Sequence, residues 1–275
     1  MKNRLIVAGI GIPALLAVIF FAPLWGWAIV VGVMAAVSAW ELTHTVLGER
    51  FHRRFGVYAA IAAFAIPIGT VFGYATITAR AAMYALFFVM FLEKMIALER
   101  REENLSFSDL AVVVFAGVVL SLLLTALVRL GMNRPKPAFI LLTFVIVWIT
   151  DSGAFFVGNA MGKHKLAPRL SPKKSVEGAV GGLLAAIVGV LLFGLVLKLC
   201  GCWVKFGWLI LYGVLGSIAG QLGDLAFSAI KREHGVKDYS NLLPGHGGML
   251  DRFDSTIFCA PLLELLVLLI PAFGM

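Results

Sequence analysis

Long apolar segments run through almost the whole of this sequence and limit the folds that the chain can adopt. Nine stretches of mostly apolar residues are each about 17 to 25 residues long, a length that crosses the hydrocarbon core of a bilayer as a helix. Hydrophobic residues make up 61% of the chain and charged residues only 14%, which is far from the composition of water-soluble domains. The predicted spans are residues 5–22, 24–40, 56–76, 81–97, 108–129, 137–160, 177–199, 207–230 and 255–273.

The pattern predicts an all-α integral membrane protein with about nine transmembrane helices. The fourth segment is the weakest, because Glu93 and Lys94 interrupt a short apolar run. An alternative with eight helices omits it, and keeps the loops at 161–176 and 231–254 on one side of the membrane. We expect the first segment to be a retained helix, because Pro23 and Trp25 follow it and no small-x-small cleavage site does.

Basic residues are distributed unequally among the loops. With nine spans, 17 of the 23 Lys and Arg residues lie in or beside the loops on the side of the N-terminus. Cytoplasmic loops carry such an excess, so the N-terminus and the loops at 161–176 and 231–254 are predicted to be cytoplasmic. The net charge of +8 therefore does not predict nucleic-acid binding, because the cations belong to short loops between spans.

Polar residues divide the predicted spans into two groups. The first five carry no ionisable residue deep in the membrane, so residues 1–130 are interpreted as scaffold helices or a dimer surface. Later spans contain Asp151, Gln221 and Asp224. A charge within a span costs roughly 2.5 to 3.5 kcal/mol on insertion scales and usually faces a cavity, so residues 131–275 are predicted to carry the function.

One face of the eighth span is polar. Gln221, Asp224, Ser228 and Lys231 follow one another at steps of three, four and three, which places them together on a helix. Such a stripe is too costly in contact with lipid, so it predicts an interior groove that opens to the cytoplasm. Four glycines of this span are interpreted as a smooth packing surface: Gly213, Gly216, Gly220 and Gly223.

The loop at 231–254 concentrates carboxylates, cations and glycines. Hard divalent cations such as Mg²⁺ prefer oxygen ligands and often share them with substrate phosphates, and Asp224, Asp251 and Asp254 suit that role. Glycine backbone N–H groups and basic side chains suit a polyphosphate. An ordinary positive loop with a turn explains Lys231 and Arg232, but not three aspartates. The other candidates are Lys237, Asp238, His246, Gly247, Gly248 and Arg252, with His246 either a phosphate donor or a turn residue.

The loop at 161–176 supplies a second basic cluster. Ser171, Lys173 and Lys174 are candidates for phosphate binding. Ser175 is a predicted N-cap for the helix that begins near Val176, whose free N–H groups could hold an anion. A solvated basic loop that meets anionic headgroups is the alternative, particularly for Lys163 and Lys165.

The string "SAIKREHGVKDYSNLLPGHGGMLDRFD", from Ser228 to Asp254, resembles the signature of the phosphatidate cytidylyltransferases, also called CDP-diacylglycerol synthases. The resemblance extends upstream to "QLGDL" and "SPKKSVEG". It covers about the C-terminal half by motif and the whole chain by layout. Ser175, Val176, Phe155 and Asn159 depart from the residues common in that family, which puts in doubt any role for positions 155 and 159.

The resemblance implies conversion of CTP and phosphatidate to CDP-diacylglycerol and pyrophosphate, in phospholipid biosynthesis, with Mg²⁺ and possibly a second cation. It implies a catalytic part at 131–275 in the cell (inner) membrane, with the active site facing the cytoplasm, and a possible homodimer. The implied catalytic residues are Asp224, Lys231, Arg232, Lys237, Asp251, Arg252 and Asp254, of which Asp224, Asp251 and Asp254 hold metal. The implied substrate-binding residues are Asp151, Ser171, Lys173, Lys174, Ser228, Asp238, His246, Gly247 and Gly248, although Asp151 could instead pair with a lysine.

Two other readings remain open from the sequence. A transporter also places acids and basic residues within its spans, but it predicts polar residues on both sides of the midplane and an internal repeat. Here the acids cluster towards one face, and no repeat is evident. Another CTP-dependent lipid nucleotidyltransferase, or a lipid kinase, would differ in its acceptor.

Overall fold

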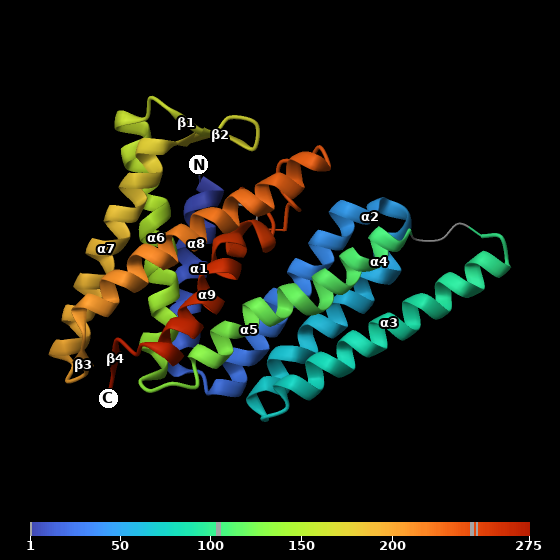
Figure 1. Ribbon diagram of the computed structural model, residues 1–275, viewed down its shortest axis with the longest axis horizontal. Coiled ribbons are helices and arrows are strands. Elements are labelled where there is room, and N and C mark those ends of the chain that lie inside the picture. The colour runs from blue at the N-terminus through green and yellow to red at the C-terminus, as the bar shows by residue number, and fades with distance from the viewer. Residues whose placement is uncertain (1, 103–105, 243–244, 246) are drawn as a thin grey trace. The chain divides into compact units, whose positions relative to one another are not determined.

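The computed structural model describes residues 2–102, 106–242, 245 and 247–275, with only the backbone described at 2–8 and 49–52. The described chain is built almost entirely of helices (Figure 1). It forms two compact units, one of Met1–Val128 and Asp238–Arg252, the other of Arg129–Lys237 and Phe253–Met275. The predicted functional division near residue 130 stays a prediction.

The first unit is a group of antiparallel apolar helices. Its elements are α1 (Lys2–Phe21), α2 (Leu24–Val71), α3 (Ala75–Glu99), α4 (Phe107–Val114), the π-helical turn η1 (Phe115–Val119) and most of α5 (Leu120–Leu130). Gly48 has a φ of 68°, and divides α2 into two apolar segments at a kink. Two hydrogen bonds tie α5 to α2: Trp27 Nε1 donates to the Leu127 carbonyl at 3.1 Å, and Ser121 Oγ donates to the Ala63 carbonyl at 2.7 Å.

The second unit contains three long helices and two small antiparallel pairs of strands. The helices are α6 (Lys136–Met161), α7 (Val176–Leu199) and α8 (Phe206–Glu233), and most of α9 (Leu250–Leu269) joins them. Strand β1 (Lys165–Ala167) pairs with β2 (Ser171–Ser175), so a hairpin lies where the sequence predicted only a loop. Strand β3 (Trp203–Val204) pairs with β4 (Phe273–Gly274).

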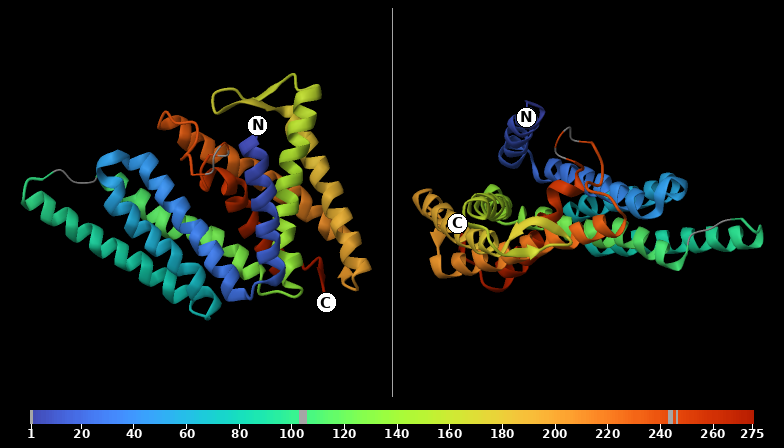
Figure 2. Two further views of the ribbon diagram at one scale, coloured as in Figure 1. Left: turned by 180° about the vertical axis from the view of Figure 1, so that it is seen from behind. Right: turned by 90° about the horizontal axis from the view of Figure 1, so that it is seen from above.

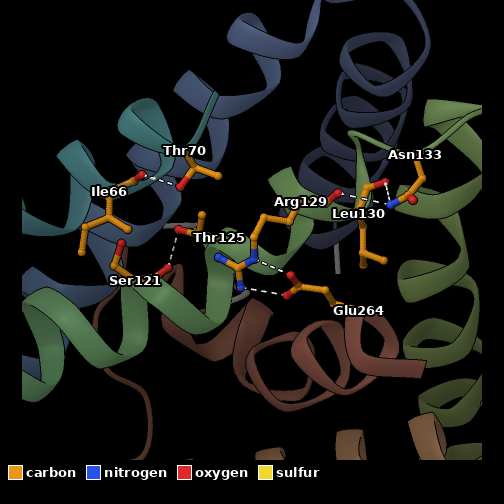
Figure 3. A network of polar contacts seen from close by, with 8 residues as sticks. All are labelled: Ile66, Thr70, Ser121, Thr125, Arg129, Leu130, Asn133 and Glu264. Atoms are coloured by element: carbon orange, nitrogen blue, oxygen red, sulfur yellow. Dashed lines mark hydrogen bonds and ion pairs between the residues drawn. The ribbon is translucent and has the colours of Figure 1, made fainter. Parts of the chain in front are cut away.

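An ion pair joins α9 to the end of α5 within this second unit. Arg129 Nη2 donates to Glu264 Oε2 at 2.8 Å, and Arg129 Nε donates to the other carboxylate oxygen (Figure 3). Both partners are partly buried. A paired guanidinium and carboxylate with two parallel hydrogen bonds is the usual way to accommodate two charges between apolar helices.

Helices α6 and α7 lie side by side because small residues let them approach closely (Figures 1 and 2). A Cβ added at Gly182 would lie 2.6 Å from the Thr150 carbonyl oxygen, which belongs to the backbone and cannot rotate away. Three of the four glycines predicted to form a packing surface on α8, Gly213, Gly216 and Gly223, do pack closely. A Cβ at Gly223 would lie 2.6 Å from the Asp254 carbonyl, and one at Gly213 would lie 2.9 Å from Val190.

We expect Gly182→Ala to destabilise the protein by about 1 to 3 kcal/mol, because the new methyl group forces two helix backbones apart. The measurement is thermal unfolding in detergent. Gly207→Ala is the matched control, since a Cβ there meets nothing within 4 Å. An unchanged midpoint in Gly182→Ala would contradict the close approach of α6 and α7.

Seven helical segments within the described ranges are long and apolar enough to cross a membrane. They include the predicted fourth span, which is the 25-residue helix α3, so the interruption at Glu93 and Lys94 does not break it. Helices α1 and α9 cover the first and last predicted segments, but neither is one of the seven. An all-α chain with several candidate spans is therefore confirmed, whereas the count of nine spans and their orientation stay predictions.

Candidate functional site

A cavity in the second unit brings together several predicted site residues. Its volume is about 270 Å³, and α6, α7, α8 and the β1–β2 hairpin contribute its walls. The charged and polar residues that line it are Asp151, Asn159, Lys173, Lys174, Ser175, Gln221 and Asp224. Phe155 also lines it, so three of the four positions that depart from the family pattern, Phe155, Asn159 and Ser175, face this cavity.

An ion pair crosses the cavity wall. Lys174 Nζ, one residue before the end of β2, lies 2.6 Å from Asp224 Oδ2 on α8. Ser228, one helical turn after Asp224, donates from its hydroxyl to Asp224 Oδ1 at 3.2 Å. Both charged side chains remain partly exposed, at 27% and 29%, so solvent and soluble ligands can reach this pair.

The basic residues of β2 reach the cavity because strand and helix meet at a capped junction. Ser175 ends β2, and its Oγ accepts a hydrogen bond from Gly178 N at 3.1 Å, which confirms the predicted N-cap of α7. Glu177, in the first turn of α7, accepts hydrogen bonds from the backbone N–H groups of Lys163 and His164. These contacts fix the hairpin to the start of α7, and so fix Lys173 and Lys174 beside α8.

The polar stripe of α8 faces the interior of the second unit. Gln221 Nε2 donates to the Ala179 carbonyl at 3.2 Å, and Gln221 and Asp224 line the cavity. Ser228 and Lys231 are buried, at 6% and 7% exposed. The face expected to avoid lipid is therefore turned towards other polar groups of the protein.

Acidic side chains of three helices influence one another in the second unit. Asp254 on α9 is 8% exposed, and it experiences repulsion from Asp224 and Asp151 and attraction from Lys231. Its Oδ1 accepts a hydrogen bond from Ser255 N at 2.7 Å. Asp151, Asp224 and Asp254 are therefore close enough to influence one another, and Lys174 and Lys231 supply opposite charge to Asp224 and Asp254.

Asp251, the third predicted metal ligand, holds a turn in the first unit. Its Oδ2 accepts hydrogen bonds from Tyr239 N at 2.8 Å and Gly248 N at 2.9 Å. Gly247, with a φ of 81°, makes the left-handed turn that this arrangement needs. One oxygen of Asp251 therefore has a structural task in addition to any role as a ligand.

Sequence reasoning missed Glu41 of α2. The predicted second span ended at residue 40, whereas α2 continues through Glu41, which is only 3% exposed. The carboxyl group accepts hydrogen bonds from Ser240 and from the backbone of Met249 and Leu250. The sequence feature that could have indicated Glu41 is its place directly after an apolar run. Burial of a carboxylate there costs free energy unless hydrogen-bond donors compensate it.

Other predicted site residues lie at the surface. Arg232 is exposed, and donates to the Leu170 carbonyl at 3.2 Å and the Val236 carbonyl at 2.8 Å. The side chains of Lys237, Asp238 and Arg252 are exposed, and Ser171 is partly exposed at the start of β2. His246 lies outside the described residues.

The donor chemistry of the carboxylates suits a hard cation. Among the residues that the structure describes, no group of three His, Cys, Asp or Glu side chains forms a ready-made metal site. Asp224 and Asp254 both belong to the second unit, and Mg²⁺ commonly uses only one or two protein carboxylates, with water and substrate phosphates as its other ligands. The site therefore fits a metal that arrives with a polyphosphate better than one held by the protein alone.

Comparison with known proteins shows to which family this chain belongs. The model of the cytidylyltransferase family matches residues 2–270. The chain belongs to the cytidylyltransferase family. The resemblance carried by the signature between Ser228 and Asp254 is thereby confirmed.

Curated members of the family that are named phosphatidate cytidylyltransferase are similar to part of this chain. The Bacillus subtilis (strain 168) protein is 49% identical over 131 residues, which are 48% of this chain and 48% of that protein. The Staphylococcus haemolyticus (strain JCSC1435) protein is 48% identical over 132 residues, or 47% of this chain and 49% of the relative. The Staphylococcus aureus (strain COL) protein is 47% identical over 131 residues, with the same shares. The chain thus matches about half the length of these relatives.

Proposed function

We propose that this cytidylyltransferase makes CDP-diacylglycerol and pyrophosphate from CTP and phosphatidate. The main support is the ion pair between Lys174 and Asp224 in the cavity of the second unit. The chain belongs to a family in which similar proteins are named phosphatidate cytidylyltransferase. The cavity combines cations for phosphate groups with carboxylates for a divalent cation. It lies among apolar helices, where a lipid acceptor can approach from the bilayer.

In the proposed reaction an oxygen of the phosphatidate phosphate attacks the α-phosphorus of CTP. A new P–O bond forms, the bond from the α-phosphorus to the bridging oxygen breaks, and pyrophosphate leaves with that electron pair. Such transfers depend on positioning and charge neutralisation, so no nucleophile from the protein is needed. Pyrophosphate is the by-product that distinguishes this reaction from a kinase reaction.

In the proposed reaction, lysine and arginine side chains neutralise the negative charge of the phosphate groups. Lys173 and Lys174 approach from β2, and Lys231 approaches from α8. Phosphate groups nearer the surface bind the exposed side chains of Arg232, Lys237 and Arg252. When CTP binds, the ammonium group of Lys174 leaves Asp224 and donates to a phosphate oxygen instead. The exchange is feasible because the ammonium group makes a charge-assisted hydrogen bond in either state.

Asp224, Asp251 and Asp254 are the residues that would hold Mg²⁺, and possibly a second cation. The metal supplies Lewis-acid stabilisation of phosphate charge when it is bound. Asp224 would be free to hold a cation if Lys174 turned from it to the nucleotide. Ser228 keeps the Asp224 carboxylate oriented throughout, through the hydrogen bond at 3.2 Å.

We further infer that the spans number about nine and that the site faces the cytoplasm of the cell (inner) membrane. The excess of Lys and Arg in the loops at 161–176 and 231–254 supports this orientation. Soluble CTP then reaches the cavity from the cytoplasm, and phosphatidate reaches it within the bilayer. The apolar outer surface of helices such as α3 leaves room for a homodimer.

Pyrophosphate release tests the proposal. Purified protein in detergent should release pyrophosphate only when CTP, phosphatidate and Mg²⁺ are all present, and removal of Mg²⁺ with EDTA should stop release. Diacylglycerol in place of phosphatidate should give none, because the attacking phosphate oxygen is missing. Equal release with diacylglycerol would favour the rival reading with a different acceptor.

A further inference from the structure

Glu41 makes an unusual set of contacts in the first unit. It is buried in α2, and both of its carboxylate oxygens accept hydrogen bonds. Oε1 accepts from Ser240 Oγ at 2.6 Å and from Met249 N at 2.9 Å, and Oε2 accepts from Leu250 N at 2.7 Å. These three donors come from one segment of the signature, almost 200 residues or more away along the chain.

The Glu41 carboxylate caps the N-terminus of α9, although the two are far apart in the sequence. Helix α9 begins at Leu250, so the N–H groups of Met249 and Leu250 have no acceptor within the helix. A nearby side chain normally supplies that acceptor, but Glu41 does so from another helix. Its negative charge is also favourable at the positive end of the helix dipole.

Gly248 allows this approach. A Cβ at that position would lie 2.5 Å from Glu41 Oε1 and 2.6 Å from Oε2, so any larger residue would push the carboxylate away from the turn. On its other side Gly248 donates to Asp251 Oδ2 at 2.9 Å. Glu41 and Asp251 therefore hold the same turn of the signature from two sides.

We propose that Glu41 is a positioning residue for the signature segment, through which a scaffold helix sets the placement of Gly248 and Asp251. The proposal rests on the proposed function, because the signature is there the phosphate- and metal-binding segment. All three partners of Glu41 are donors, so a carboxylate fits this position. An amide does not, because its NH₂ group would face another N–H.

The test compares Glu41→Gln with Glu93→Gln in the intact protein. Glu93 is the matched control, because it is another acid of the first unit, partly buried, that accepts hydrogen bonds, from Arg54 and Tyr58. Two measurements are made on folded protein: turnover of CTP and phosphatidate, and amide hydrogen exchange of peptides that cover residues 247–252.

In Glu41→Gln we expect exchange in that peptide to accelerate roughly tenfold or more, because hydrogen bonds to a charged group are lost. Turnover per folded molecule should fall at least as far, and Glu41→Asp should recover part of it. Glu93→Gln should change neither measurement at the signature. A merely structural role would reduce the yield of folded protein and leave turnover per folded molecule intact.

Normal exchange or normal turnover in folded Glu41→Gln would overturn the proposal. If that variant does not fold, Ser240→Ala replaces it, since it removes one donor and leaves the carboxylate in place; unchanged exchange and turnover there would overturn it equally. If wild-type protein makes no CDP-diacylglycerol, the proposed function fails. The exchange measurement still reports on the contact of Glu41 in that case.

Discussion

Asp224→Asn should lower kcat/KM for CTP by at least about a hundredfold, the loss usual for removal of one preorganised electrostatic contact at a transferring group. Asparagine has the same shape, and its Oδ1 can still accept from Ser228. What is lost is the negative charge that pairs with Lys174 at 2.6 Å and that is proposed to hold Mg²⁺. Steady-state kinetics at saturating phosphatidate provide the measurement.

Glu264→Gln is the control for this variant. It removes the carboxylate of another partly buried ion pair of the second unit, the one with Arg129, which does not line the cavity. We expect it to lower the midpoint of thermal unfolding without a loss of turnover in the folded protein. Wild-type turnover in Asp224→Asn would remove the proposed role of that carboxylate.

Lys174→Met should lower kcat/KM for CTP roughly tenfold to a hundredfold, because one hydrogen bond between an ammonium group and a phosphate is lost. Methionine keeps much of the apolar stem and removes the ammonium group with its charge and its N–H donors. The same change leaves Asp224 without its partner across the cavity, so binding of Mn²⁺ to the protein without nucleotide should tighten. Kinetics and a Mn²⁺ titration measure the two effects separately.

Lys165→Met is the matched control, because Lys165 lies on the same hairpin but does not line the cavity. It should leave both measurements unchanged. Equal losses in the two variants would mean that the hairpin contributes only a general positive charge near the membrane. That result would favour the alternative reading of the hairpin as a solvated basic loop.

Local physics made much of the fold predictable. Apolar runs of membrane-spanning length must form helices, because the bilayer offers no partner for backbone N–H and C=O groups. Ser175 was predictable as an N-cap, because capping depends on residues within one turn, and Gly178 N does bond to its hydroxyl. The stripe from Gln221 to Lys231 was predictable from helical spacing alone.

Contacts between distant segments were not predictable in the same way. Loop charge placed Lys174 and Asp224 near one face of the membrane, but nothing in the sequence showed that they meet at 2.6 Å. The β1–β2 hairpin depends on pairing across a short turn and on the Glu177 contacts, which no periodicity records. Glu41 was missed because its partners lie in another segment, up to 209 positions away.

CTP labelled at two phosphates distinguishes nucleotidyl transfer from phosphoryl transfer. Purified protein receives phosphatidate, Mg²⁺ and CTP carrying one label on the α-phosphate and a different label on the γ-phosphate. The proposed reaction puts the α-label into a lipid product and the γ-label into pyrophosphate, in equal amounts. Transfer of the γ-label to lipid would show a kinase, and absence of both labels from lipid would contradict nucleotidyl transfer altogether.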